Sequence, residues 1–417
     1  MSESNWAGSY TYRAGTIHRP STLEQLQEIV ASAPRMRVLG SRHSFTDIAD
    51  SDELVVLDGL PADVVVDAGA GTVSCGAALT FGELAAALHA EGVALPNLGS
   101  LPHISVAGAV ATATHGSGDG NRNLAAGVAA LEIVSSSGDM VRASRGDANF
   151  DGLVVGLGAL GAITRLTLDV VPMYRVRQRV FERLSWNALF DNFDAVTSAG
   201  YSVSAFTGWG DAVDQVWVKR RVTDAPEPDV DDFFGATPAT VERHPILGID
   251  PVNCTAQLGA PGLWSDRLPH FRMGFTPSSG EELQSEFLVA RPRALGALQA
   301  MRDLGHVIQP VLQVSEIRTV AADELWMSPQ YRQDTVGIHF TWVRDADRVN
   351  NVLADVEAAL APYRARPHWG KLFLADAADI GPLYERLGDF ARLVDELDPR
   401  GAFRNDWLST RVLGREN

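Results

Sequence analysis

Leu39-Gly40-Ser41-Arg42-His43-Ser44-Phe45 is the stretch that decides the fold, because it places small residues directly after a strand-like run at residues 36–39. Exposed backbone N–H groups and small side chains in a turn that follows a strand can approach phosphate oxygens closely. In such a loop His43 would lie beside a phosphate-bearing ligand. From chemistry alone, however, a single loop histidine is more often a solvated hydrogen-bonding residue.

A second glycine-rich stretch, Pro96–Gly108, is followed by Ala111–Gly118, and together they offer many backbone donors and hydroxyl groups with few bulky side chains. Taken alone, both segments are explained equally well by tight crossovers in an α/β core, since glycine clusters are weak indicators. Together with the loop around His43 they favour phosphate binding.

The pattern Gly156-x-Gly158-x-x-Gly161 matches the dinucleotide-binding fingerprint, but its context is wrong. A helix should follow the last glycine, whereas residues 163–168 continue as a β-like run. We therefore interpret these glycines as packing residues.

Composition excludes several classes of protein. A chain of 417 residues is too long for one ordinary core and predicts two domains. The formal net charge of −17 disfavours a nucleic-acid partner and an anionic membrane surface. Cys75 and Cys254 are too few for a disulfide framework or a zinc site, so we expect no metal.

The N-terminus lacks the features of a signal peptide and no long apolar run occurs, which predicts a cytoplasmic location.

The pattern of predicted secondary structure changes near Pro172. Before it, short strand patterns alternate with helices, one of which has a capping box at Thr80 and Glu83. After it, β-rich stretches dominate, and the segment 225–232 is predicted to be an exposed loop. Helical patterns return from about Pro367. We expect an α+β protein divided into residues 1–172, residues 173–366, and a segment 367–417 that packs back on the first domain.

Two polar pairs lie in strand-like runs near the end of the second region. Glu316 and Arg318 are two residues apart, as are His339 and Thr341, so each pair points to one face of its strand. A surface ion pair would explain the first pair as well. Two such pairs with apolar neighbours nevertheless indicate one wall of a pocket.

These segments resemble one known family. The Gly-Ser-x-His-Ser loop at Gly40–Ser44, the stretch Ser105–Ser117 and His368-Trp369-Gly370-Lys371 are similar to the vanillyl-alcohol oxidase superfamily of covalent flavoproteins, and within it to the alditol oxidases. The similarity extends through nearly the whole chain, including Val252–Thr255 and Glu316–Ala322. It implies a two-domain FAD-binding fold, in which the middle region forms a substrate cap domain with an antiparallel sheet.

The resemblance also implies the cofactor and its contacts. FAD would be attached through its C8 methyl group to His43. Where the alditol oxidases have glycine before this histidine, the chain has Arg42, which would place a cation on the phosphates or disturb the linkage. The residues expected to line the FAD are Gly40, Ser41, Arg42, His43, Ser44, Ser100, Ser105, Gly108, Thr112, Ala113, Thr114, His115, Ile163 and Lys371.

For the reaction, the resemblance implies that the terminal primary alcohol of an alditol gives hydride to flavin N5. Oxygen then reoxidises the flavin, and the products are an aldose and hydrogen peroxide. Lys371 would stabilise the negative charge that develops on the reduced flavin. Residues expected to bind the substrate are Ser100, Glu316, Arg318 and Thr341, and those expected to take part in catalysis are Glu316, Arg318, His339 and Lys371.

Two alternatives remain open. An aldonolactone oxidase or dehydrogenase would share the histidine loop and the Glu-x-Arg pattern. A non-catalytic carbohydrate-binding protein could keep the same fold. For the main hypothesis we expect a monomer whose partners are a polyol and oxygen.

Overall fold

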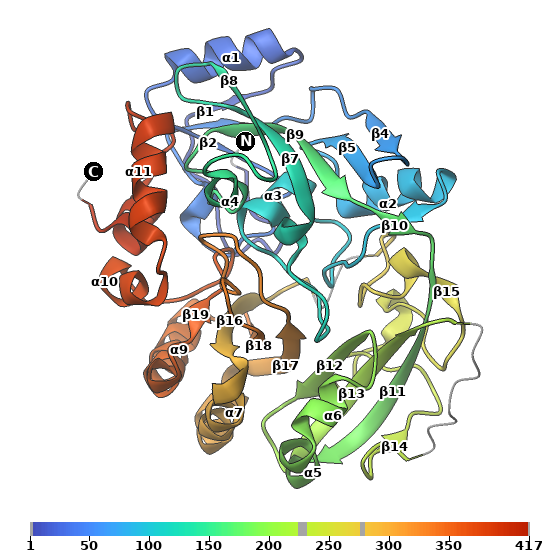
Figure 1. The fold of residues 1–417 in the computed structure, drawn as a ribbon. Coiled ribbons are helices and arrows are strands. Elements are labelled where there is room, and N and C mark those ends of the chain that lie inside the picture. Colours follow the sequence, from blue (N-terminus) through green and yellow to red (C-terminus); the bar gives the residue numbers. More distant parts are fainter. Residues whose placement is uncertain (1–2, 224–231, 276–279, 416–417) are drawn as a thin grey trace.

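The computed structural model describes residues 3–223, 232–275 and 280–415, and shows an α+β fold built around several sheets (Figure 1). The predicted loop at 225–232 lies outside the described residues, apart from Asp232. Both cysteines are buried and free. Among the described helices, none combines the length and apolar character needed to cross a bilayer.

The N-terminal part begins with a small parallel sheet in the order β1-β3-β2. Its elements are β1 (Thr16–His18), α1 (Leu23–Ser32), β2 (Met36–Val38) and β3 (Glu53–Val55). Leu26 and Val30 of α1 are fully buried in one cluster with Met36. The predicted helix, strand and glycine-rich loop are confirmed here, because β2 ends immediately before Leu39 and Gly40.

A five-stranded antiparallel sheet follows in the order β4-β5-β9-β7-β8. Its strands are β4 (Val64–Asp67), β5 (Thr72–Gly76), β7 (Val128–Val134), β8 (Met140–Ser144) and β9 (Ala162–Asp169). Strand β9 begins directly after Gly161, so the prediction that no helix follows this glycine pattern is confirmed.

Short helices connect this sheet to the loops of the site. Helix α2 (Phe81–Ala90) starts with the predicted capping box of Thr80 and Glu83. Helix α3 (Val106–Ala111) starts at Ser105 and lies between the two glycine-rich segments, while α4 (Phe150–Val154) precedes β9. The pair β6 (Val93–Ala94) and β10 (Val171–Pro172) closes this part of the chain.

The middle region forms a large antiparallel sheet in the order β14-β11-β13-β12-β17-β18-β16-β19, with β15 paired to β11. The antiparallel sheet predicted for this region is therefore confirmed. Its strands are β11 (Arg175–Ser185), β12 (Ser202–Thr207), β13 (Ala212–Arg221), β14 (Thr237–Pro238), β15 (Gly262–Leu263), β16 (Leu283–Ala290), β17 (Leu312–Val320), β18 (Thr335–Trp342) and β19 (Arg366–Pro367).

Helices cover the outer side of this sheet. Helices α7 (Ala294–Asp303) and α9 (Ala346–Leu360) contact each other, and α7 contacts β16 and β18 (Figure 1). Helices α5 (Trp186–Asp191) and α6 (Phe193–Thr197) lie at the other end of the sheet. The N-terminal sheets and α3 lie on the opposite side of β16, β17 and β18 (Figure 1).

The C-terminal segment returns to the N-terminal part. It contains α10 (Ala377–Ile380), α11 (Leu387–Leu397) and α12 (Asp406–Leu408). The amide of Met36 donates to the carbonyl of Ala402 at 2.7 Å, and Phe403 is buried in the cluster that contains Met36. The division into domains with boundaries at 172 and 366, and the assignment of residues 367–417 to the first domain, stay predictions.

Candidate active site

A cavity lies between the loop after β2, helix α3 with its flanking loops, and the strands β16, β17 and β18. These elements come from distant parts of the chain and meet only because the large sheet faces the N-terminal part. The expected site residues Gly40–Ser44, Ser100, Ser105, Gly108, Thr112, Thr114 and His115 line the cavity, as do Glu316, Arg318, His339, Thr341 and Lys371. Ala113 and Ile163 are not among its lining residues.

The loop before His43 is packed tightly against the start of α3. The Ser105 amide donates to Ser41 Oγ at 2.8 Å. A Cβ on either Gly40 or Gly108 would lie 2.7 Å from Ser105 Oγ, closer than packed atoms allow. These glycines therefore keep the backbone of the loop and of the helix start in mutual contact, and leave the adjoining cavity free of side chains.

His43 is held as a neutral imidazole. Its Nδ1 lies 3.1 Å from Ser41 Oγ, and the ring stacks on Trp6 with 5.5 Å between ring centroids. Burial lowers the pKa of His43 to about 4, and His103 adds to this effect. A neutral imidazole has a free lone pair and is the form that can act as a nucleophile.

Arg42 has an unusual backbone conformation for a residue with a side chain. Its φ of +61° lies in the left-handed region, where glycine is favoured. The guanidinium group forms an ion pair of 3.0 Å with Glu3, and both side chains are partly exposed. The left-handed backbone explains why glycine suits position 42. The positive charge of Arg42 is paired with the carboxylate of Glu3.

Several buried polar atoms that belong to cavity-lining residues lack a hydrogen-bond partner within the described chain. A buried unsatisfied donor or acceptor costs about 1 to 3 kcal/mol, so such atoms indicate a site for a polar ligand. They are Trp6 Nε1, Arg42 Nε and Arg318 Nε, whereas His115 Nε2 lies 3.3 Å from Glu286 Oε1. A large cofactor with phosphates, a ribityl chain and a heteroaromatic ring fits this distribution along the cavity.

The opposite wall is formed by the two predicted polar pairs. Glu316 of β17 is directly opposite His339 of β18, so Arg318 and Thr341 extend the same surface. All four side chains are buried. Arg318 Nη1 donates to Ser100 Oγ at 3.3 Å, which connects this wall to the glycine-rich loop.

Glu286 of β16 is the centre of the charge network and was not predicted from the sequence. Its oxygens lie 2.6 Å from Arg318 Nη2 and 2.7 Å from Lys371 Nζ. Burial would raise its pKa, but the two cations prevail and hold the pKa of Glu286 well below its ordinary value. Gly337 makes room for it, since a Cβ there would lie 3.0 Å from Oε1.

Lys371 and His339 complete this network. Lys371 Nζ donates to Glu286 Oε2 and to His339 Nδ1 at 2.8 Å, which leaves one N–H for a ligand. His339 Nε2 lies 3.1 Å from Thr341 Oγ1. Burial and Lys371 lower the pKa of His339 to about 4, so the ring is neutral.

His115, Glu286 and His368 also come within the distances needed to share a metal ion. Glu286, however, already neutralises Arg318 and Lys371 at hydrogen-bond distance. A divalent cation would lie beside two positive side chains, so the charge distribution favours the hydrogen-bonded network over a metal centre.

Comparisons with known proteins agree with this architecture. The chain matches a family model for the FAD binding domain over residues 15–144 and a model for D-arabinono-1,4-lactone oxidase over residues 286–411. It is 49% identical over 409 residues to the alditol oxidase of Streptomyces sp. (strain IKD472 / FERM P-14339), with 97% of each chain covered. It is 28% identical to the L-gulono-1,4-lactone dehydrogenase of Mycobacterium tuberculosis (strain ATCC 25618 / H37Rv), with 99% of each chain covered.

The fold is also similar to that of solved cholesterol oxidase structures. Cholesterol oxidase from B. sterolicum superimposes with a TM-score of 0.77 at 14% identity, covering 98% of this chain and 96% of that chain. Fold, cavity and FAD-binding sequence together define a flavin-dependent oxidoreductase with FAD as cofactor. Within that class, the chain belongs to the alditol oxidase family of the vanillyl-alcohol oxidase superfamily.

Proposed function

We propose that this protein oxidises the terminal primary alcohol of alditols such as xylitol and sorbitol to the aldose, and reduces oxygen to hydrogen peroxide. The observation that carries the proposal is the alternation of donors and acceptors on this wall, where the buried Glu316 and Arg318 lie near the partly exposed Lys371. A chain of hydroxyl groups needs both kinds of partner in fixed places, since each buried hydroxyl left unpaired costs about 1 to 3 kcal/mol.

The wall residues would bind the substrate in complementary roles. Arg318 and the free N–H of Lys371 donate to hydroxyl oxygens, while Glu316 accepts from hydroxyl groups. Two cations beside the reacting hydroxyl lower its pKa and favour loss of its proton. Ser100 and Thr341 add two hydroxyl groups that can donate or accept at the two ends of the wall.

FAD, when bound, supplies a hydride acceptor and passes the electrons to oxygen. Its proposed holders in this chain are the loop Gly40–Ser44 and the residues around α3, including Ser105, Gly108 and Thr112–His115. Lys371 would lie where the reduced flavin carries negative charge, and its ammonium would be held there by Glu286. A role for Ala113 and Ile163 beside the FAD stays a prediction from the resemblance.

We further propose that the FAD is attached to His43. The stacked, neutral imidazole of His43 supports this, because only the unprotonated ring has the lone pair needed to form a bond to carbon. Denaturing gel electrophoresis, viewed for flavin fluorescence, tests the linkage. We expect a fluorescent full-length band that is absent in a His43→Ala variant; a dark wild-type band would contradict the linkage.

An aldonolactone oxidase remains the second candidate, because the lactone-oxidase model matches residues 286–411, which carry most of the polar wall. Peroxide formation separates the two. We expect hydrogen peroxide with xylitol or sorbitol and much less with a sugar lactone, and the reverse order would favour the alternative. An aldonolactone dehydrogenase would give no peroxide but would have its flavin reduced by the lactone, whereas a carbohydrate-binding protein without activity would show neither peroxide nor flavin reduction.

The cytoplasmic location and the monomeric state stay predictions from the sequence. Gel filtration with light scattering tests the second, and a mass of one chain, 44.8 kDa plus cofactor, is the expected result.

A further inference from the structure

Lysine is almost absent from this chain. The sequence has 35 basic residues of the lysine and arginine type, and only Lys219 and Lys371 among them are lysine, which leaves 33 arginines. Lys371 lies in the charge network around Glu286. Lys219 is fully buried, and it has no role in the alditol oxidation proposed for this site. A buried cation in a chain that otherwise uses arginine indicates a need for a compact ammonium group.

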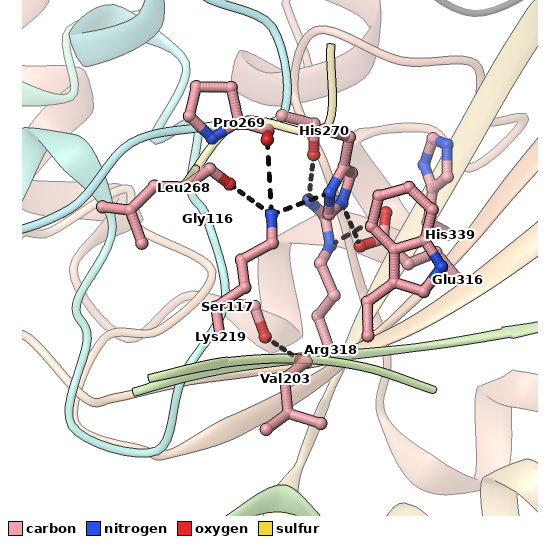
Figure 2. A network of polar contacts seen from close by, with 12 residues as sticks. Gly116, Ser117, Val203, Lys219, Leu268, Pro269, His270, Glu316, Arg318 and His339 are labelled. Atoms are coloured by element: carbon pink, nitrogen blue, oxygen red, sulfur yellow. Dashed lines mark hydrogen bonds and ion pairs between the residues drawn. The ribbon is translucent and has the colours of Figure 1, made fainter. Parts of the chain in front are cut away.

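Lys219 is surrounded by acceptors. Its Nζ, on strand β13, donates to the carbonyl of Leu268 at 2.5 Å and to His270 Nδ1 at 3.0 Å, with the carbonyl of Pro269 at 3.4 Å (Figure 2). Three acceptors match the three N–H groups of an ammonium ion. Burial lowers the pKa of Lys219 to about 7, and the charge of Glu316 counteracts this while Arg318 adds to it.

His270 connects Lys219 to the wall of the cavity that carries Glu316 and Arg318. Its Nε2 lies 2.9 Å from Glu316 Oε1, and the ring is enclosed by Phe206 and Trp217, each at 5.4 Å between ring centroids and nearly perpendicular. Figure 2 shows Lys219, His270 and Glu316 in one line of contacts that continues to Arg318. The imidazole therefore bridges a buried ammonium and a buried carboxylate.

The bridge permits one tautomer of a neutral ring. Burial and Lys219 lower the pKa of His270 to about 4, so the ring carries a single proton at neutral pH. An ammonium on Nδ1 requires a lone pair there, and the proton must then be on Nε2, where it is donated to Glu316. The other tautomer would set a lone pair against the Glu316 carboxylate.

We propose that Lys219 is a positioning residue that holds His270 in the Nε2–H tautomer and thereby fixes Glu316 Oε1, so that Glu316 Oε2 is directed to the substrate hydroxyl. Oε2 lies 3.6 Å from Arg318 Nε, a donor without a partner among the described residues. A hydroxyl group that accepts from Arg318 Nε and donates to Glu316 would complete both. The inference rests on the proposed function for the identity of the substrate alone.

Lysine suits this task better than arginine. Its ammonium is a compact donor on a thin stem and fits between two carbonyl groups and one ring nitrogen, whereas the wider planar fork of arginine presents five N–H groups. With three acceptors around Nζ, a guanidinium group would leave at least two buried donors unpaired.

Histidine tautomers can be read directly by nitrogen NMR of the holoenzyme with labelled histidine, in which the His270 signals are assigned by their loss in a His270→Gln variant. We expect His270 to be protonated on Nε2 in the wild type at about pH 6, below the pKa of Lys219. In a Lys219→Met variant Glu316 still accepts from Nε2–H, but the ammonium that lowers the pKa of His270 is gone, so we expect that pKa to rise. A wild-type ring protonated on Nδ1 would overturn the proposal, and so would an unchanged His270 pKa in the variant.

Steady-state kinetics with xylitol give the second readout. Loss of one charge-assisted orientation of Glu316 should raise KM by about 10- to 30-fold with a smaller change in kcat, because Glu316 binds the substrate before and during the reaction. Gln178→Met is the matched control: Gln178 is buried and directly opposite Lys219 in the sheet, and its amide donates to residues 255 and 256. Equal effects of the two variants on KM would overturn the proposal.

The NMR experiment does not need turnover. If the wild type failed to oxidise alditols, the proposed function would fall while the tautomer of His270 would still decide the role of Lys219. If Lys219→Met did not fold, the tautomer of the wild-type ring alone would decide it.

Discussion

The indole ring of Trp6 stacks on the imidazole of His43 at an interplanar angle of 23°, and the Trp6 amide donates to the carbonyl of Arg42 at 3.0 Å. The N-terminal segment therefore covers the proposed attachment residue. An aromatic contact of this kind is worth about 1 kcal/mol, which corresponds to about a five-fold preference for one ring orientation.

Replacement of Trp6 should therefore slow formation of the covalent flavin. For Trp6→Ala we expect attachment of added FAD to apoprotein to be about five-fold slower, measured as fluorescence retained after acid precipitation. Trp6→Phe keeps a stacked ring and should attach FAD at nearly the wild-type rate. Equal rates for the alanine and wild-type proteins would show that the stack has no role in attachment.

Arg42 is expected to carry backbone strain. Glycine adopts a φ of +61° at little cost, whereas a residue with a Cβ costs about 1 kcal/mol there. Arg42→Ala and Arg42→Gly both remove the ion pair with Glu3 and differ in this strain. We expect the glycine variant to be more stable than the alanine variant by about 1 kcal/mol in urea denaturation. An alanine variant of equal or higher stability would contradict the assignment of strain to this position.

Glu286 was not predicted from the sequence, but we expect it to be essential for both activity and stability. Glu286→Gln keeps the shape but leaves the buried Arg318 and the partly buried Lys371 without their shared counter-ion. Removal of one partner from a buried ion network costs about 3 to 5 kcal/mol. We predict a fall in kcat/KM of at least about 100-fold and a lower free energy of unfolding. Near wild-type kinetics and stability in the Glu286→Gln variant would show that Glu286 does not organise the site.

The buried histidines predict loss of stability in acid. His270 and His339 have a pKa of about 4 when folded, against 6.5 for a solvated histidine. The unfolded chain therefore binds more protons than the folded protein between these values, so the free energy of unfolding falls as the pH is lowered from about 6.5 to 4. Below about pH 4.5 the depressed pKa of Glu286 adds a further loss in the same direction.

Urea denaturation at several pH values checks this. Each histidine contributes at most about 1.4 kcal/mol per unit of pKa shift. Replacement of His339 by Gln removes one titrating group, so the slope of stability against pH between 4 and 6.5 should become smaller. A stability that is independent of pH in this window would mean that the rings are not buried in the neutral form.

Local patterns predicted much of the fold. The alternation of strand and helix before Pro172 and the capping box at Thr80 arise from interactions between residues close in sequence, and they appear as expected. The pairs Glu316–Arg318 and His339–Thr341 were predictable because the two-residue period of a strand sets which side chains share a face.

The centre of the site was not predictable in the same way. Glu286 acquires its role because β16 pairs with β18, which sets it opposite His339, and Lys219 reaches Glu316 only through a loop residue, His270. Such long-range pairings leave no periodic pattern. The sequence does contain two indications: Glu286 stands beside the apolar run Phe287–Val289, and the two lysines contrast with 33 arginines.

Anaerobic mixing of the purified holoenzyme with xylitol, followed by flavin absorbance, is the decisive experiment for the proposed oxidation of alditols. We expect the oxidised flavin band to bleach with xylitol and far less with a sugar lactone, and we expect admission of oxygen to restore the band. A flavin that stays oxidised with alditols, or that is reduced only by the lactone, would contradict the proposal that this protein is an alditol oxidase.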